Sequence, residues 1–177
     1  MCIRDSYLTS DHPNGACFWR YPEIIHLLMN ADFRRECIEK LPDKALERIH
    51  LPGIDREYTL SEIAIITSAG PARALGMPQK GHLGVGADAD VVLYNDDSDR
   101  EHMFGHPRYL LKGGEVVVEE GDIRKMVDGR ECIVRPGYDE NIEEYLRPLF
   151  EQYYTMSFDN YPVEMERLEG ADIRECG

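Results

Sequence analysis

The sequence of 177 residues predicts an α/β protein, and three stretches carry this prediction. The first is an apolar, β-favouring run at residues 7–9, followed by Asp11, a turn at residues 13–15 and a segment with helical character. The second is a capped amphipathic helix after Thr59. The third is a series of short apolar runs and glycine turns that starts at residue 91.

Asp11 is the candidate catalytic residue of the first stretch. A strand, a carboxylate, a loop and a helix in this order are how a parallel α/β barrel presents a catalytic group at the C-terminal end of a strand. The alternative is local turn chemistry, because Asp and Asn bond their own backbone in turns.

Composition excludes several classes of function. A net charge of −14 argues against a nucleic-acid binder, which needs a basic face. No apolar run approaches the roughly 20 residues of a membrane span, and no signal peptide is expected. The odd number of cysteines and the lack of a Cys-x-x-Cys motif indicate a reducing, cytoplasmic location without a zinc finger. These are Cys2, Cys17, Cys37, Cys132 and Cys176.

Helices are expected between residues 22 and 76. Pro22 suits the first turn of a helix at residues 22–29, and Asp32 is the expected N-cap of a second helix at 33–41. A third is expected at residues 43–49. Thr59 and Glu62 match a capping box that opens a further helix. In that helix, Gly70–Pro71 is expected to interrupt the chain and Gly76 to end it.

Short strands are expected in the region that follows. The glycine-rich residues 80–90 are not a phosphate loop, because they lack its lysine motif and precede a strand. Residues 91–94 are expected to form a short buried strand. Gly113–Gly114 predicts a hairpin between strands at 109–112 and 115–119, and a last strand is expected at 132–134.

The composition changes after residue 135, since residues 135–177 hold 11 acidic and 4 basic residues. A helix is expected at residues 143–154, with Tyr145, Leu149 and Tyr153 on one face. Residues 164–177 are expected to be frayed. Aromatic side chains in this region suggest that part of it packs on another protein of a complex. They are Tyr153, Tyr154, Phe158 and Tyr161.

Candidate substrate contacts flank Asp11. Aromatic side chains beside Arg20 and Tyr21 suit a substrate pocket in which the guanidinium pairs with an anionic group. A packed loop at a domain boundary is the alternative. His12 and Asn14 either orient Asp11 and touch substrate or serve the turn itself.

Three segments resemble the C-terminal part of the amidohydrolase superfamily. They are residues 9–14 (Thr-Ser-Asp-His-Pro-Asn), 67–76 (Thr-Ser-Ala-Gly-Pro-Ala-Arg-Ala-Leu-Gly) and 81–91 (Gly-His-Leu-Gly-Val-Gly-Ala-Asp-Ala-Asp-Val). The pairing of Ser-Asp-His-Pro-Asn-Gly at 10–15 with Arg-Tyr-Pro-Glu at 20–23 is similar to the hydrolase subunits of formylmethanofuran dehydrogenases and formyltransferase/hydrolase complexes.

The resemblance implies a fold and a reaction. The fold is the end of a TIM-type hydrolase barrel followed by part of a small β-sandwich and an acidic helical tail. The reaction interconverts formylmethanofuran with formate and methanofuran, in a complex with other subunits. It also implies a binuclear zinc site, with Asp11 as a metal ligand and proton shuttle. No His-x-His, which such a site requires, occurs in the sequence. We therefore expect these 177 residues alone to be inactive.

The expected domain boundaries follow from the same resemblance. Residues 1–6 are expected to be a non-native remnant, with a short disordered terminus as the alternative. Residues 7–79 would form the last barrel strand and its helices, 80–137 strands of a composite sandwich, and 138–177 the acidic tail. Two other functions remain open: another amidohydrolase, such as a dihydroorotase-like enzyme, and a non-catalytic module that docks partner subunits.

Overall fold

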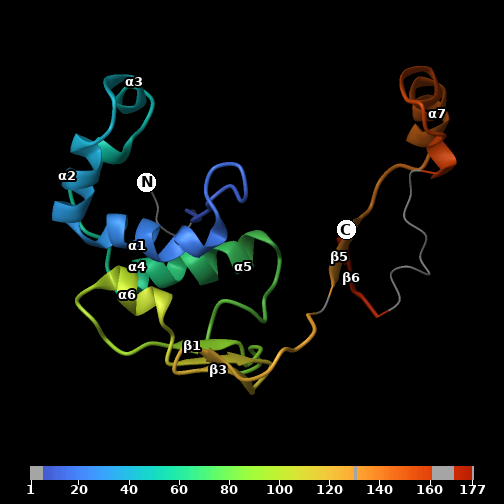
Figure 1. Cartoon of the computed structure of the whole chain (residues 1–177). Coiled ribbons are helices and arrows are strands. Elements are labelled where there is room, and N and C mark those ends of the chain that lie inside the picture. Colours follow the sequence, from blue (N-terminus) through green and yellow to red (C-terminus); the bar gives the residue numbers. More distant parts are fainter. Residues whose placement is uncertain (1–5, 130, 161–169, 177) are drawn as a thin grey trace. The chain divides into compact units, whose positions relative to one another are not determined.

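The structure is a computed structural model that describes residues 6–129, 131–160 and 170–176. The remnant expected at residues 1–6 therefore lies almost entirely outside the described residues. The chain divides into two compact units, Met1–Val127 and Asp128–Gly177. Helices and strands occur in both units, which confirms the predicted α/β class at this level (Figure 1).

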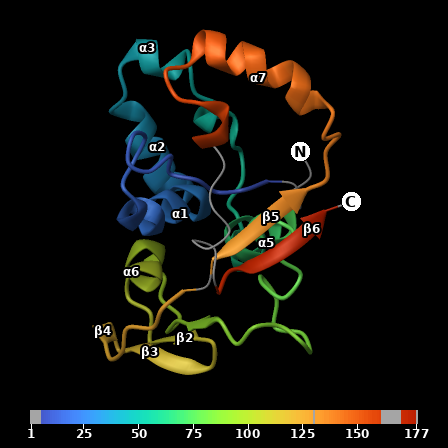
Figure 2. The same ribbon diagram turned by 90° about the vertical axis from the view of Figure 1, so that its right-hand side faces the viewer.

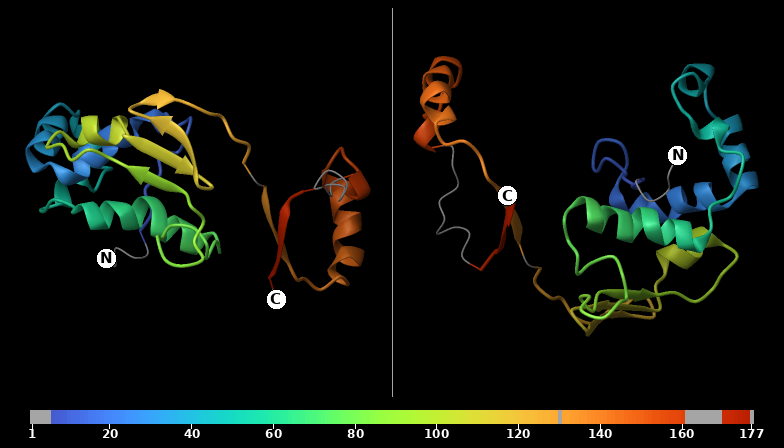
Figure 3. Two further views of the ribbon diagram at one scale, coloured as in Figure 1. Left: turned by 90° about the horizontal axis from the view of Figure 1, so that it is seen from below. Right: turned by 180° about the vertical axis from the view of Figure 1, so that it is seen from behind.

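The first unit places a layer of helices against a small sheet (Figures 1 and 3). Its helices are α1 (Tyr21–Met29), α2 (Ala31–Glu39), α3 (Asp43–Leu46), α4 (Leu60–Ala64), α5 (Gly70–Ala74) and α6 (Arg100–Gly105), with short 3₁₀ turns η2 (Phe18–Arg20) and η3 (Leu51–Gly53). Ile25, Ile63 and Ile66 form the buried centre, and Leu8 packs against it. The core therefore joins α1 and α4 to the segment that precedes Asp11.

Helix starts follow local chemistry, with one correction. The capping box is confirmed, because Glu62 N donates to Thr59 Oγ1 (3.3 Å) and Thr59 N donates to the Glu62 carboxylate (2.9 Å). The prediction that Asp32 caps the second helix is wrong. Asn30 caps it and accepts a bond from Phe33 N at 2.9 Å. Asn30 has the extended backbone that an N-cap needs, whereas Asp32 already lies in the first helical turn.

The predicted interruption at Gly70–Pro71 is also wrong, because a π-helical turn, η4 (Ile65–Ala69), joins α4 to α5. Gly70 N donates to Ile65 O, five residues back, and Pro71 has no N–H. The carbonyl of Ile66 is thereby left without a donor from its own helix. Leu8 N occupies it instead, at 3.0 Å.

Two glycines bring the segments of the predicted motifs into backbone contact. A Cβ on Gly81 would lie 2.8 Å from both Ala69 Cα and Ser68 O, so the glycine-rich loop rests on η4. A Cβ on Gly70 would lie 3.1 Å from Ser6 O. Glycine is therefore required for the chain to pass this closely on either side of the helix.

The sheet of the first unit is antiparallel, in the order β1-β2-β3-β4. Its strands are β1 (Val91–Leu93), β2 (Tyr109–Lys112), β3 (Glu115–Glu119) and β4 (Asp122–Ile123). The hairpin at Gly113–Gly114 is confirmed, since both glycines have positive φ and Lys112 pairs with Glu115. The prediction that the first strand is buried is wrong, because Val92 and Leu93 are 41% and 46% exposed. Nothing in the described part of the chain covers these side chains.

Asp90 fastens the glycine-rich loop to this sheet. Its carboxylate accepts bonds from Lys80 and Lys112 at 2.6 Å each and from Gly113 N at 2.9 Å. The hydrogen bonds from Lys112 and then Lys80 hold the pKa of Asp90 well below its usual range. Asp88, followed by Asp90, raises the pKa of Lys80 in turn. The ion pairs therefore persist across the ordinary range of pH.

The second unit contains β5 (Cys132–Pro136), α7 (Ile142–Tyr153), the short turn η5 (Phe158–Asn160) and β6 (Asp172–Cys176). The helix and the strand at 132–134 are confirmed. The prediction of a frayed end is wrong for residues 172–176, which pair in parallel with β5 (Figure 2). Residues 161–169, and Tyr161 with them, lie outside the described residues. None of the described helices in either unit is long and apolar enough to cross a membrane.

Candidate functional site

Asp11 lies in a closed turn at the start of the chain. Gly15 N donates to Asp11 O at 2.8 Å, and Ala16 N donates to Ser10 O at 2.7 Å. A Cβ on Gly15 would lie 2.7 Å from Ser10 O, so only glycine fits there. Asp11 has a φ of 52°, a left-handed conformation that Asp tolerates better than most residues.

The segment leading into this turn was predicted to be a strand, which is wrong for the described structure. Residues 7–9 are extended but pair with no strand among the described residues. A strand needs a neighbouring strand to complete its hydrogen bonds. Instead, the bond from Leu8 N to Ile66 O and the packing of Leu8 against the core hold this segment. The π-helical turn thus determines where Asp11 is placed.

The Asp11 side chain is open to solvent. The described residues make no hydrogen bond or ion pair to its carboxylate, and its backbone N–H donates to Thr9 Oγ1 at 3.2 Å. Asn14 is exposed in the same turn, as is His12. The turn therefore presents a carboxylate, an imidazole and an amide within four consecutive residues.

Three rings gather beside Asp11, and we call Phe18, Trp19 and His12 the aromatic shelf. The centroids of His12 and Phe18 are 5.2 Å apart, and those of Phe18 and Trp19 are 5.4 Å apart, both edge to face. His12 also meets Trp19 at 6.4 Å. The aromatic residues of this loop were predicted to form a pocket wall, but no motif selected Phe18 or Trp19. The signal was present in three aromatic residues within positions 18–21.

The other two predicted substrate residues separate in space. Arg20 Nε pairs with Glu23 Oε2 at 2.5 Å, an i,i+3 partner that was not predicted from the sequence. Tyr21 is the first residue of α1 and lines a cavity of about 670 Å³. Asp11, His12, Asn14 and Arg20 do not line this cavity. The structure therefore groups Asp11, His12 and Asn14 in one turn and places Tyr21 in a separate hollow.

That cavity is enclosed mainly by apolar side chains of the helices and of β1. Its wall includes Leu8, Ile25, Ile63, Val92, Met103 and Phe104. Asp90 reaches the wall, but its carboxylate is already bonded to Lys80 and Lys112. The cavity thus offers apolar volume rather than a set of reactive groups.

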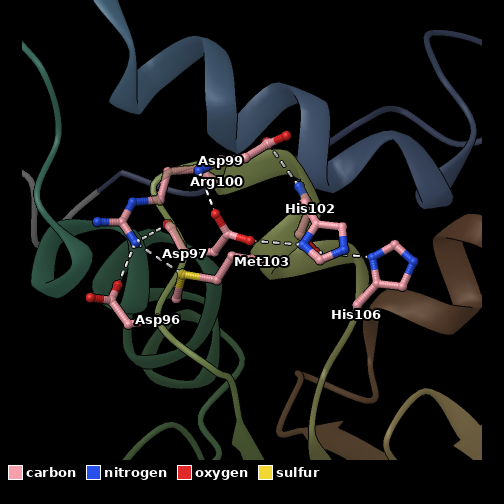
Figure 4. A network of polar contacts seen from close by, with 7 residues as sticks. All are labelled: Asp96, Asp97, Asp99, Arg100, His102, Met103 and His106. Carbon is pink, nitrogen blue, oxygen red and sulfur yellow. Dashed lines mark hydrogen bonds and ion pairs between the residues drawn. The ribbon is translucent and has the colours of Figure 1, made fainter.

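A second polar cluster lies at the start of α6 (Figure 4). Asp97 accepts bonds from Asp99 N and from His102 Nδ1, both at 2.9 Å. The backbone bond from Asp99, followed by the bond from His102, lowers the pKa of Asp97. Asp99 caps the helix by accepting from His102 N, and the His106 ring stacks on that of His102. These groups satisfy one another and fix the first turn of α6.

The donor set at Asp11 does not make a complete zinc site. Protein zinc sites generally hold the ion with three or four His, Cys, Asp or Glu ligands. No three such side chains come together in the residues that the structure describes. The exposed Asp11 carboxylate fits the chemistry of a single ligand, so the described residues supply one part of such a site.

The helical layer, the sheet and the position of Asp11 agree with a hydrolase of one family. The model of the Amidohydrolase family, Amidohydro_3, matches residues 6–118, and the chain belongs to this family.

Its relatives are considerably longer. The chain is 42% identical over 156 residues to the first of the Fhc proteins (FhcA) that make up the formyltransferase/hydrolase complex of Methylorubrum extorquens, covering 88% of this chain and 28% of that protein. It is 42% identical over 171 residues to "Protein FwdA" of Methanocaldococcus jannaschii, covering 90% and 30%.

A solved structure matches over almost the whole chain. It is the FhcABCD formyltransferase/hydrolase complex of Methylorubrum extorquens with methylofuran, at a TM-score of 0.80 and 37% identity. The match covers 99% of this chain and 33% of the other chain. The chain therefore spans about a third or less of the length of these relatives.

Proposed function

We propose that this chain is part of an amidohydrolase that interconverts a formylated, methanofuran-type amine with formate and the free amine. The observation that carries the proposal is the open Asp11 carboxylate, held in a rigid turn within a segment 42% identical to FhcA. In this proposal the chain works inside a complex with other subunits, as its solved relative does.

The proposed place of the chain in a longer protein follows the expected boundaries. Residues 7–79 would close a TIM-type barrel, with 7–9 as its last strand once a neighbouring strand pairs with them. Residues 80–137 would contribute strands to a composite sandwich, and 138–177 would form an acidic tail. An open β1 and an unpaired segment 7–9 support this interpretation, because both lack neighbours among the described residues.

Asp11 would carry the proton in this reaction. Its carboxylate accepts a proton from the water that attacks the formyl carbon and donates it to the amine nitrogen as the C–N bond breaks. Formate and the free amine are the products, so atoms balance with one water consumed. A carboxylate without internal hydrogen bonds keeps both oxygens available for this transfer.

The proposed cofactor is a pair of zinc ions, with Asp11 as one ligand and the other ligands in parts of the relatives that this chain does not cover. Bound zinc polarises a carbonyl and lowers the pKa of its water. His12 and Asn14 would orient the Asp11 carboxylate or the formyl group. Arg20 would exchange Glu23 for an anionic group of the carrier, and Tyr21 would line its path.

The proposal is tested by substituting Asp11→Asn in the complete enzyme. We expect formyl hydrolysis to fall by orders of magnitude at an unchanged melting temperature, because the amide cannot accept the proton. Asp43→Asn, at the start of α3, is the matched control with full activity. Near-normal turnover of Asp11→Asn would remove Asp11 from the mechanism. We also propose that the 177 residues alone are inactive, and chelator-sensitive hydrolysis by them would refute this.

A second candidate function is a non-catalytic module that docks partner subunits. The observation that favours it is α7, whose apolar side chains are exposed along one face. A complete protein that binds its partner subunits but lacks hydrolysis would select this function. A dihydroorotase-like amidohydrolase is the other alternative, and hydrolysis of a cyclic amide without activity on formylated amines would select it.

A further inference from the structure

We propose that the aromatic shelf beside Asp11 binds the flat ring of the amine substrate and holds its formyl group at the carboxylate. This inference rests on the proposed function and extends it to residues that no motif selected. The ligand class is a planar aromatic ring bearing an aminomethyl group, as in a furfurylamine.

The exposure of the rings is the first observation. Phe18 is 59% and Trp19 is 65% exposed, although each contacts the other and His12. Edge-to-face contacts at centroid distances of about 5 to 6 Å are the favoured geometry for aromatic pairs and leave ring faces available. The shelf thus has open aromatic faces already in the orientation that a further ring would meet.

The rigidity of the shelf is the second observation. On one side, His12 is held in the turn closed by the bonds of Gly15 and Ala16. On the other side, η2 is closed by Arg20 N donating to Cys17 O at 2.9 Å and leads directly into α1. Side chains fixed before binding lose little entropy when a ligand arrives, so a small ring can be retained.

The position of the shelf is the third observation. His12 is covalently adjacent to Asp11, so a ring stacked on the shelf lies beside the carboxylate. Arg20 follows Trp19 directly and pairs with Glu23 on the exposed side of the loop. The sequence therefore places a ring-binding surface between a carboxylate and a cation, an order that suits an aromatic amine with an anionic tail.

Trp19 is the only tryptophan in the chain, so its fluorescence reports on the shelf directly. The probe is N-formylfurfurylamine, and its matched control is the saturated N-formyltetrahydrofurfurylamine. We expect a saturable fluorescence change for the aromatic probe, with a dissociation constant on the order of millimolar, and none for the saturated one. Equal responses to both probes, or no saturable response, would overturn the proposal.

Variants separate the shelf from aromatic residues elsewhere. We expect Phe18→Leu to weaken binding of the aromatic probe roughly threefold to tenfold, the value of one ring contact. Tyr153→Leu, an exposed aromatic residue on α7, is the control and leaves binding unchanged. An equal loss in both variants would show non-specific contact and refute the assignment.

Kinetics of the complete enzyme distinguish this inference from the function on which it rests. We expect Phe18→Leu to raise KM for N-formylfurfurylamine by a similar factor and to leave KM for an N-formylalkylamine unchanged. Hydrolysis of both substrates with no such difference would refute the shelf and leave the function intact. Absence of hydrolysis would refute the function, and the fluorescence experiment would still decide on the shelf. A lower melting temperature of Phe18→Leu without a change in KM would show that protein covers the rings, which also refutes the shelf.

Discussion

The two units of the chain differ in what they do with their apolar side chains. In the first unit, Ile63 is 1% exposed, and five other apolar residues are buried around it or nearby. In the described residues of the second unit no side chain is buried. Both units contain amphipathic helices, so the difference lies in the surfaces that meet these helices.

Helices α4 and α7 make this comparison concrete. α4 and its π-helical extension bury Ile63 and Ile66 between α1 and the segment before Asp11. On α7, Tyr145 and Tyr153 are exposed, although they repeat at helical spacing. A stripe of this kind stabilises a fold only when an apolar surface covers it. The first unit carries its own stabilising core, whereas α7 needs a surface from beyond the described residues.

The largest effect is expected at the centre of the first unit. Ile63→Ala should lower the free energy of unfolding by about 3 kcal/mol, because a buried isoleucine leaves a cavity that closes only in part. The matched variant Leu146→Ala on α7 should change it by less than about 0.5 kcal/mol. Urea unfolding followed by circular dichroism measures both. Equal losses would mean that α7 is as well packed as α4.

The next effect concerns the contact between the glycine-rich loop and η4. Gly81→Ala combines a φ of 77° with a Cβ 2.8 Å from the backbone of Ser68 and Ala69, so we expect a loss of about 2 to 4 kcal/mol. Gly86→Ala is the control, with a φ of 86° and open space around its Cβ. It should lose only about 1 kcal/mol. Similar melting temperatures for the two variants would contradict the close approach.

A smaller effect is expected from pH. Hydrogen bonds from Arg56 and then from Thr59 lower the pKa of Glu62 to about 2, below its value in an unfolded chain. The stabilisation is therefore complete above about pH 4.5 and is lost as the pH falls towards 2. Glu62→Gln should flatten the melting temperature over this window, whereas Glu144→Gln on α7 should not. An unchanged profile for Glu62→Gln would show that the capping box contributes nothing through its charge.

The smallest effect on global stability is expected at Pro71. Pro71→Ala supplies an N–H with which the helix can satisfy the Ile66 carbonyl, in competition with Leu8 N. We expect faster hydrogen exchange at the Leu8 amide with a change in melting temperature of less than a few degrees. Pro22→Ala in the first turn of α1 is the control and should leave the exchange of Leu8 unchanged. Unaltered exchange in Pro71→Ala would mean that the π-helical turn does not hold this segment.

Sequence patterns determined those features whose partners lie within a few residues. The capping box of Thr59 and Glu62, the hairpin at Gly113–Gly114 and the helix at residues 142–153 all close their hydrogen bonds locally. The candidate Asp11 was selected in the same way, from a turn and a resemblance. The family was also visible in the sequence, because its motifs are short and contiguous.

The tertiary structure alone decided the features that depend on distant partners. Residues 7–9 have β-favouring composition, yet their extended backbone is held by a helix carbonyl 58 positions further along, at Ile66. Residues 172–176 have a polar composition typical of a frayed end, yet they pair with β5. The π-helical turn and the grouping of His12, Phe18 and Trp19 likewise arise from contacts across the fold. A pattern states which groups need partners, and only the folded chain determines which groups meet.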